Sequence, residues 1–217
     1  MKAVRQVWGS LMAMLVVVAA MPASADSDSL RQYVDDNTQA LVQELNEKRG
    51  LYNSDREAFY EQMESALSNF VDFRRIAARV MGRYARQASP EQRDAFVEKF
   101  KRSLFDSYAK ALVEADHFTI SVGDATINPS NEERASVELQ VTTASGNRYP
   151  VVYSMYLNDN DRWMMENVIV EGVNIGLAFR DRFAQEMEEK RNNVQAVIDG
   201  WTDTVKELDL DKKVDQS

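Results

Sequence analysis

Residues 118–170 read FTISVGDATINPSNEERASVELQVTTASGNRYPVVYSMYLNDNDRWMMENVIV, and this segment has the alternating pattern of β-strands. Phe118, Ile120 and Val122 alternate with polar residues, and the same period returns in residues 135–141, 149–157 and 162–170. Loop sequences at 128–131, 144–147 and 158–161 separate the four segments. Because such short connections cannot cross over a sheet, we expect four strands in an antiparallel meander.

The third and fourth predicted strands are apolar on both faces. Tyr153 and Met155 alternate with the large residues Val152 and Tyr156. In the fourth strand, one face is expected to carry Trp163, Met165 and Ile169, and the other Met164, Val168 and Val170. Such a sheet is either covered by helices on both sides or lines an apolar space that holds something other than protein. The period alone leaves both alternatives open.

Helical spacing of apolar residues occurs on both sides of the strand segment. Ser54-Asp55-Arg56-Glu57 has the form of a capping box with Ser54 at the N-cap, and Ser89-Pro90-Glu91-Gln92 is a stronger start signal. We expect helices over residues 29–48, from Ser54 to about 70, over 72–84, from Ser89 for about seven turns, and over 175–187 and 194–205. Helices, then strands, then helices predict one α+β domain.

The composition excludes several functional classes. The net charge of −9 argues against a general nucleic-acid binder. No Cys and a single His exclude thiolate metal sites, His-based triads and multi-His zinc sites. No G-x-S-x-G, Walker or dinucleotide-binding glycine pattern is present. We therefore expect no catalytic residues, no metal and no cofactor.

The first 25 residues have the features of a secretory signal peptide. Lys2 and Arg5 precede an uncharged apolar run over residues 7–20, and Ala23-Ser24-Ala25 supplies a cleavage signal. The run is shorter than the roughly 20 residues needed to span a bilayer. We expect export, with residues 26–217 forming the mature single domain; losing two cations takes its net charge from −9 to −11.

One segment of this acidic chain is strongly basic. Five arginines and no acidic residue lie between Asp72 and Glu91, and four of the arginines share one predicted helical face: Arg75, Arg79, Arg83 and Arg86. This face is either a docking surface for an acidic partner or for lipid phosphates, or a solvated face balanced by acids on a neighbouring helix.

The chain resembles the MlaC (toluene-tolerance, Ttg2-type) family. The resemblance covers nearly all of residues 26–208 and rests on three motifs: FRRIAARVMG at 73–82, ASPEQR at 88–93 with the apolar stripe of 96–108, and residues 163–174 followed by FRDRF at 179–183. Two positions depart from the family pattern. Asn167 stands where an Asp is expected, and Asn174 where a Ser is usual.

The resemblance implies an NTF2-like fold in which a curved sheet and helices enclose an apolar pocket for phospholipid acyl chains. Members of this family are periplasmic and carry phospholipid between an outer-membrane lipoprotein–porin complex and an inner-membrane ABC transporter with an MCE-domain ring, which maintains outer-membrane lipid asymmetry. Nothing in the sequence demands more than a monomer.

For a two-chain lipid, the pocket should reach about 1,000 Å³, the upper end of ordinary pockets. From the strands we predict as lining Val137, Leu139, Val141, Val151, Tyr153, Met155, Trp163, Met165 and Ile169. From the helices we predict Phe73, Ile76, Val80, Phe100, Leu104, Tyr108, Ile175 and Phe179. If the opposite strand face lines the pocket, the first set is wrong as a block.

Two other functions remain open at this point. An NTF2-like pocket also suits an enzyme that uses a buried Asp or Tyr on a small apolar substrate, which would need a carboxylate with a perturbed pKa inside the cavity. Alternatively, the apolar residues form a filled core in an interaction protein that carries no lipid.

Overall fold

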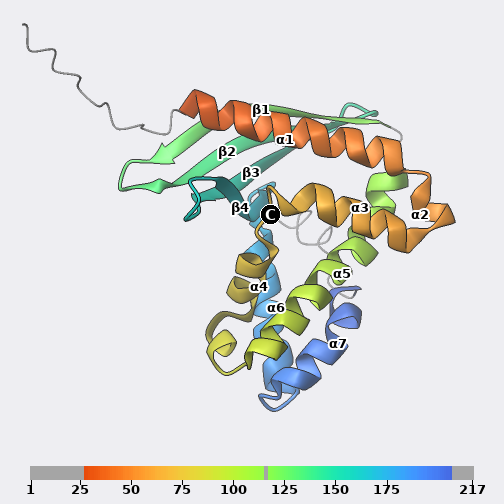
Figure 1. Cartoon of the computed structure of the whole chain (residues 1–217), viewed down its shortest axis with the longest axis vertical. Coiled ribbons are helices and arrows are strands. Elements are labelled where there is room, and N and C mark those ends of the chain that lie inside the picture. Colours follow the sequence, from red (N-terminus) through yellow and green to blue (C-terminus); the bar gives the residue numbers. More distant parts are fainter. Residues whose placement is uncertain (1–26, 115–116, 207–217) are drawn as a thin grey trace, which may run out of the picture.

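A computed structural model describes residues 27–114 and 117–206 and shows an antiparallel sheet at one end of the molecule and a helical bundle at the other (Figure 1). The elements follow in the order α1 Ser27–Lys48, α2 Leu51–Ser54, α3 Arg56–Ser68, α4 Phe73–Met81, the 3₁₀ helix η1 Gly82–Arg86, α5 Pro90–Glu114, β1 Phe118–Asn128, β2 Asn131–Thr143, β3 Arg148–Leu157, β4 Trp163–Val170, β5 Val173–Asn174, α6 Ile175–Glu189 and α7 Val194–Lys206. The predicted signal peptide lies outside these residues. None of the described helices has the length and apolar character that a membrane span requires.

The sheet is a meander with strand order β1-β2-β3-β4-β5, and every neighbouring pair is antiparallel. This confirms the predicted α+β class and topology, with one more strand than expected. The extra strand, β5, has only two residues, too few to produce a period. Strand β1 is longer than predicted because a bulge between Val122 and Ala125 interrupts its alternation and hides the second half.

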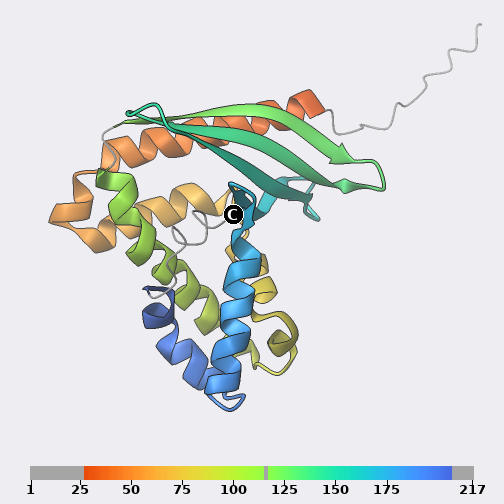
Figure 2. The same cartoon turned by 180° about the vertical axis from the view of Figure 1, so that it is seen from behind.

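Helix α1 covers one face of the sheet (Figure 1). Leu30 and Val34 in the first half of α1 pack into a core with Val137, Leu139 and Met155 of the sheet. Figure 2 shows the opposite face of the sheet, and none of the described helices lies over β1 and β2 on this side. These helices therefore do not cover both faces of β1 and β2, whereas Arg75 of α4 lies over Tyr156 on the outer face of β3.

The lower half of the molecule is a bundle formed by α4, α5, α6 and α7, with a packed aromatic core (Figure 1). Its centre is Trp201, with rings at 5.1 Å from Phe96 and 5.6 Å from Phe183 between centroids. All three side chains are fully buried. Burying an aromatic side chain of this kind contributes about 1.5–3 kcal/mol, so this core holds the bundle together.

The two predicted capping boxes have different outcomes. Gln92 donates its backbone N–H to Ser89 Oγ at 3.2 Å, and its side chain accepts from the Ser89 N–H at 3.0 Å, which confirms the second box. The first is wrong, because Ser54 ends α2 and Asp55 is the N-cap of α3, accepting from the Ala58 N–H at 3.1 Å.

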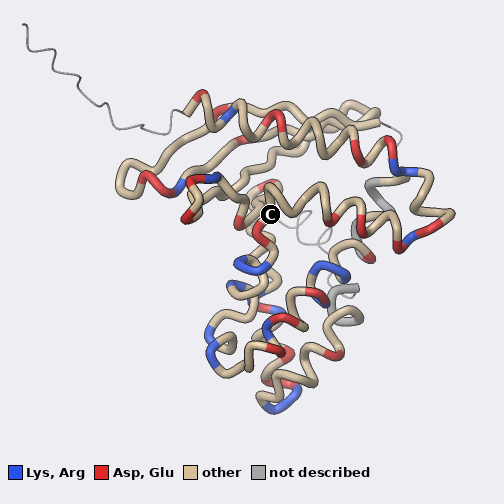
Figure 3. The backbone as a smooth tube through the Cα atoms, viewed as in Figure 1, with Lys and Arg blue, Asp and Glu red and all other residues tan. Residues whose placement is uncertain are grey.

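The helix predicted over residues 72–84 ends earlier. Gly82 has a φ of +55°, which terminates α4 at Met81, and the chain continues as η1. The four arginines therefore do not share one helical face: Arg75 and Arg79 lie on α4, whereas Arg83 and Arg86 lie on η1. Figure 3 shows basic residues along α4 and the segment that follows it.

Candidate functional site

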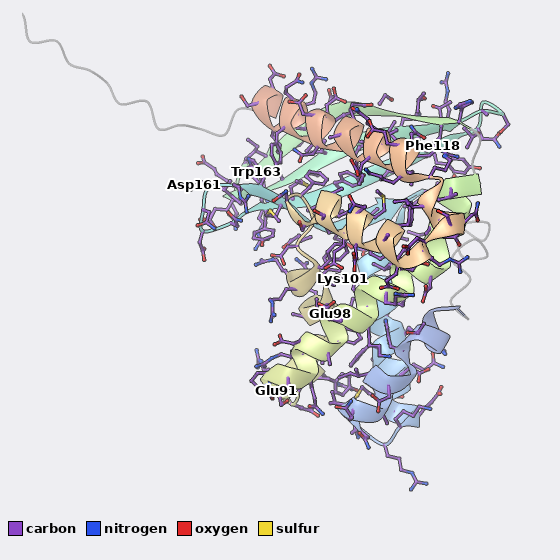
Figure 4. The ribbon with its side chains drawn as sticks, turned by 45° about the vertical axis from the view of Figure 1, so that its right-hand side comes forward. Glu91, Glu98, Lys101, Phe118, Asp161 and Trp163 are labelled. Carbon is purple, nitrogen blue, oxygen red and sulfur yellow. The ribbon has the colours of Figure 1, made fainter. Side chains whose placement is uncertain are left out.

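An apolar hollow of about 360 Å³, which we call the sheet chamber, lies between the second half of α1, α3, α5 and the sheet. It is lined by Leu41, Val42, Leu45, Phe59, Met63, Leu67, Phe73, Leu104, Phe105, Ala109, Phe118, Ile120 and Tyr153. Figure 4 shows that Phe118 lies at the opposite end of the sheet from Trp163. The space under the sheet is thus hollow near Phe118, whereas Trp163 belongs to the filled core against α1.

A second apolar hollow of about 210 Å³, the bundle chamber, lies among α4, α5, α6 and β4. Its walls include Ile76, Phe100, Met165, Ile175 and Phe179. The two chambers share Leu67, Phe73 and Leu104, so these three side chains stand between them. The two chambers are therefore adjacent, with these three side chains separating the space under the sheet from the space in the bundle.

The predicted lining residues divide into three groups. Eight line the chambers: Phe73, Ile76, Phe100, Leu104, Tyr153, Met165, Ile175 and Phe179. Six lie in the core between α1 and the sheet: Val137, Leu139, Val141, Val151, Met155 and Trp163. Val80 lines a neighbouring polar pocket, and the side chain of Tyr108 lies outside the described residues. Lipid contact by any of these side chains stays a prediction.

Ile169 lies on the face of β4 opposite to the one that strand alternation predicts. A bulge in the pairing of β3 with β4 places Met165 opposite Met155 but Val168 opposite Tyr153. Ile169 pairs with Val152, whose side chain points to the outer face. Val168 therefore lines the bundle chamber in the place expected for Ile169.

Sequence reasoning missed much of the sheet chamber. Leu41 and Leu45 of α1 and Phe59, Met63 and Leu67 of α3 are visible as helical apolar stripes. The stripes show that these residues are buried, but their spacing does not distinguish a filled core from a cavity wall.

The expected volume of about 1,000 Å³ is not reached in this structure. The chambers measure about 360 and 210 Å³. The walls would therefore have to move apart to admit both chains of a two-chain lipid.

A larger hollow of about 480 Å³ lies between α3, α5 and α7, but charged side chains line it. Lys101 is only 8% exposed there and forms ion pairs with Glu64 and, at 2.8 Å, with Glu98 (Figure 4). Arg102 reaches Glu57 of α3 at 2.6 Å. These ion pairs link α3 to α5 and make this hollow a poor site for hydrocarbon.

A fourth hollow, about 340 Å³, adjoins the bundle chamber, and we call it the polar pocket. It shares Ile76, Asn167 and Gly176 with that chamber. Its remaining lining residues are Arg79, Val80, Glu166, Asn174, Leu177 and Arg180. The bundle chamber therefore adjoins a pocket that carries two cations, Arg79 and Arg180.

Glu166 is the central charge of this region and is only 6% exposed. It accepts from Arg75 Nε at 2.5 Å, Arg79 Nη1 at 2.5 Å and Arg134 Nη1 at 2.9 Å. Burial alone raises the pKa of Glu166, but the hydrogen bonds from Arg75 and Arg79 and the charges of Arg79 and Arg134 outweigh it, so its pKa is lowered. The acid that neutralises Arg75 and Arg79 is thus Glu166 of strand β4, whereas the sequence-based alternative expected acids on a neighbouring helix.

The remaining predicted docking arginines have other surroundings. Arg83 donates to the Tyr84 hydroxyl at 2.7 Å, and both Arg83 and Arg86 are exposed. Tyr156, on the outer face of β3, lies beneath the Arg75 guanidinium at 4.0 Å and donates its hydroxyl hydrogen to Asp72. Stacking by Arg75 therefore covers Tyr156, one of the large residues on the outer face of β3. Partner docking by the four arginines stays a prediction.

The two departures from the family pattern lie together at the start of α6. Asn167 donates to Asn174 Oδ1 at 3.1 Å and accepts from the Gly176 N–H at 3.0 Å, and Asn174 caps the Leu177 N–H at 2.9 Å. An Asp at position 167 could not make the donation to Asn174. A Cβ at Gly176 would lie 2.4 Å from Asn167 Oδ1, so this packing requires glycine.

The chemistry available in the two chambers is limited. Among their described lining residues, Tyr153 is the ionisable one, and burial raises its pKa to about 12. Its phenol is therefore neutral at physiological pH. The described residues hold no cluster of three or more His, Asp or Glu side chains arranged for a metal ion. The two chambers can enclose a hydrocarbon chain, and the adjoining polar pocket presents the cations Arg79 and Arg180.

Comparison with known proteins agrees with this geometry. The family model of the MlaC protein matches residues 35–203. The chain belongs to the MlaC family. A toluene tolerance protein, ttg2D, from Pseudomonas putida is 37% identical to this MlaC family member over 194 residues, which is 88% of this chain and 89% of the relative.

A solved structure has the same fold. It is a phospholipid-binding protein from Ralstonia solanacearum in complex with a phospholipid, with a TM-score of 0.71 at 19% identity. The match covers 81% of this chain and 96% of that protein. The family assignment and the MlaC-type fold that the sequence motifs predicted are thereby confirmed.

Proposed function

We propose that this protein is a periplasmic phospholipid carrier. It would move glycerophospholipids between the outer and inner membranes and so maintain outer-membrane lipid asymmetry. The observation that carries the proposal is the pair of apolar chambers that share Leu67, Phe73 and Leu104. Membership of the MlaC family and the phospholipid held by the Ralstonia protein of the same fold support it.

A lipid carrier must bury the acyl chains of its ligand and does not need catalytic groups. Each methylene buried is worth about 0.8 kcal/mol, so a sixteen-carbon chain costs on the order of 12 kcal/mol to expose to water. A carrier therefore needs apolar walls, and release needs a partner that opens the walls or offers equal burial. The Met and Phe side chains of the chambers can adapt to chains of different length.

The partners that we propose are an outer-membrane lipoprotein–porin complex and an inner-membrane ABC transporter with MCE domains. Family membership supports this pairing. Arg83 and Arg86 are the more available of the predicted docking arginines, because Arg75 and Arg79 are engaged by Glu166. We also propose that residues 1–25 direct export and that residues 26–217 act as one domain.

The carrier is favoured over a pocket enzyme. The enzyme would need a buried acid or base inside the apolar space, whereas the ionisable side chain among the described walls is the neutral Tyr153. The interaction-protein alternative would need a filled interior, and the chambers argue against it.

Lipid extraction tests the proposal directly. The exported protein is purified without detergent and extracted with organic solvent, and the extract is analysed by mass spectrometry. We expect glycerophospholipid in near-stoichiometric amount, and reloading of the delipidated protein from phospholipid vesicles. Protein that carries no lipid and takes none from vesicles would overturn the proposal.

A further inference from the structure

We propose that the polar pocket binds the phosphate diester of the carried lipid through the guanidinium groups of Arg79 and Arg180. This inference rests on the proposed carrier function and assigns a place to the headgroup. The same chemistry would also attract free phosphate, and the experiment below separates the two sources.

The position of the pocket supports a headgroup. The polar pocket and the bundle chamber have Ile76, Asn167 and Gly176 in common, so they meet at a wall of three residues. A lipid with a tail in the bundle chamber would bring its glycerol to that wall. Leu177, which is 41% exposed, lies on the polar side and offers apolar contact to the glycerol region.

The charge balance of the pocket favours an anion. Glu166 is the acidic side chain among its described walls, and it accepts from three guanidinium groups at once. Asp72 adds a second carboxylate, since it accepts from Tyr156 beneath the Arg75 guanidinium. Two carboxylates therefore face the three guanidinium groups of Arg75, Arg79 and Arg134, so one positive charge is left over. The positive charge of Arg79 is therefore not fully neutralised by the protein. Its side chain is 56% exposed, so a ligand can reach it.

Arg180 supplies the second cation from α6. The aliphatic part of its side chain lies along Gly82, within 3.6 Å of the position that a Cβ would take there. Its contact with the neighbouring Asp181 is 3.5 Å long, and both side chains are more than half exposed, so the pair is weak. The guanidinium is thus held near the pocket and remains available to a phosphate.

The backbone at the start of α6 does not compete for this role. The N–H groups of Gly176 and Leu177 already donate to Asn167 and Asn174. The two arginines are therefore the cationic donors that an incoming phosphate meets among the described walls of this pocket. The positive end of the α6 dipole adds to the attraction without supplying a hydrogen bond.

The test compares Arg180→Gln with Arg74→Gln, since both remove one exposed arginine and only Arg180 lines the pocket. Delipidated proteins are titrated with phosphatidylglycerol and with diacylglycerol of the same chains, each in vesicles of an inert carrier lipid. We expect Arg180→Gln to weaken phosphatidylglycerol binding about tenfold, which corresponds to about 1.4 kcal/mol, and to leave diacylglycerol binding unchanged. Arg74→Gln should bind both lipids as the wild type does. Arg79→Gln should resemble Arg180→Gln.

Several outcomes would overturn the inference. Equal loss of both lipids in Arg180→Gln would show a structural effect, and unchanged binding of both would show that the phosphate lies elsewhere. If Arg180→Gln weakens binding of inorganic phosphate, followed by NMR, but not of phosphatidylglycerol, the pocket serves free phosphate and the headgroup assignment is wrong. A wild-type protein that binds neither lipid would overturn the carrier function itself.

Discussion

The core of the helical bundle around Trp201 and the space beneath the sheet near Phe118 contain the same kinds of side chain, yet the first is filled and the second is hollow. Phe96, Phe183 and Trp201 meet at centroid distances of 4.9 to 5.6 Å in the bundle. Phe73 and Leu104 instead stand between two hollows. Both regions are strongly apolar, so composition does not decide which one is empty. The arrangement of the elements decides it, and a carrier needs one region of each kind.

The largest effect should come from closing the hollow region. Leu104→Trp places an indole where the two chambers meet. If the bulk excludes about half of a sixteen-carbon chain, about 6 kcal/mol of binding is lost at 0.8 kcal/mol per methylene. The measurement is lipid per protein after extraction and after reloading from vesicles. Leu104→Met nearly conserves the side-chain volume and should bind as much lipid as the wild type. A Leu104→Trp protein that binds the wild-type amount of lipid would contradict an acyl chain that occupies both chambers.

Alanine substitutions of two phenylalanines, one in the bundle core and one in the chamber wall, compare how tightly the two regions are packed. Phe183→Ala removes a fully buried ring from the bundle core and should lower the free energy of unfolding by about 3–5 kcal/mol. Phe73→Ala should cost about 1 kcal/mol, because the half-buried Phe73 ring already faces empty space on two sides. Urea unfolding of the delipidated variants measures both values. Equal losses would mean that the chamber wall is as tightly packed as the bundle.

Glu166 joins the two regions, because it binds Arg75 and Arg79 of α4 and Arg134 of β2. Glu166→Gln should cost about 2 kcal/mol of unfolding free energy, less than for a fully buried pair because the arginines are partly exposed. The pKa of Glu166 is lowered from its ordinary value of 4.5. Its stabilising charge is therefore present above about pH 4.5 and is lost as the pH falls through the lower folded value.

The measurement is urea unfolding of the wild type and Glu166→Gln between acidic and neutral pH. The stability difference between the two proteins should shrink in acid. A difference that stays constant across this range would show that the Glu166 charge does not contribute.

The smallest effect concerns the surface of the bundle half. Arg83→Glu with Arg86→Glu should slow lipid transfer to membranes that carry the transporter complex by about three- to tenfold, with the difference shrinking at high salt. Lipid content should stay at the wild-type level because both side chains are exposed outside the chambers. The exposed Lys190→Glu serves as the charge control. An unchanged transfer rate would remove the docking role from these two arginines.

The prediction of the strands succeeded where the local period was clean and failed where a bulge altered it. Residues 135–141 alternate without interruption, and their register against β3 is regular. In β4 the bulge before Asn167 reverses the faces, so Val168 takes the place predicted for Ile169. A bulge depends on how two strands pair, and the sequence of one strand does not record it.

The candidate site was predictable only in part, for a related reason. Helical stripes correctly indicated Phe100 and Phe179 as buried residues, and both line the bundle chamber. Strand alternation predicted Val137 and Met155 as lining, and the structure shows both packed against the first half of α1, so their contact with lipid stays a prediction. Whether a buried side chain meets another side chain or a hollow depends on elements that are distant in sequence.

The amino-acid sequence by itself determined the class of fold, the strand order and the family, because periodicity, turn residues and motifs are local properties of the chain. Tertiary structure alone decided where the interior is hollow, which arginines Glu166 engages and how the polar pocket meets the bundle chamber. These features depend on the distances between elements that are separate in sequence, and those distances are set by tertiary packing.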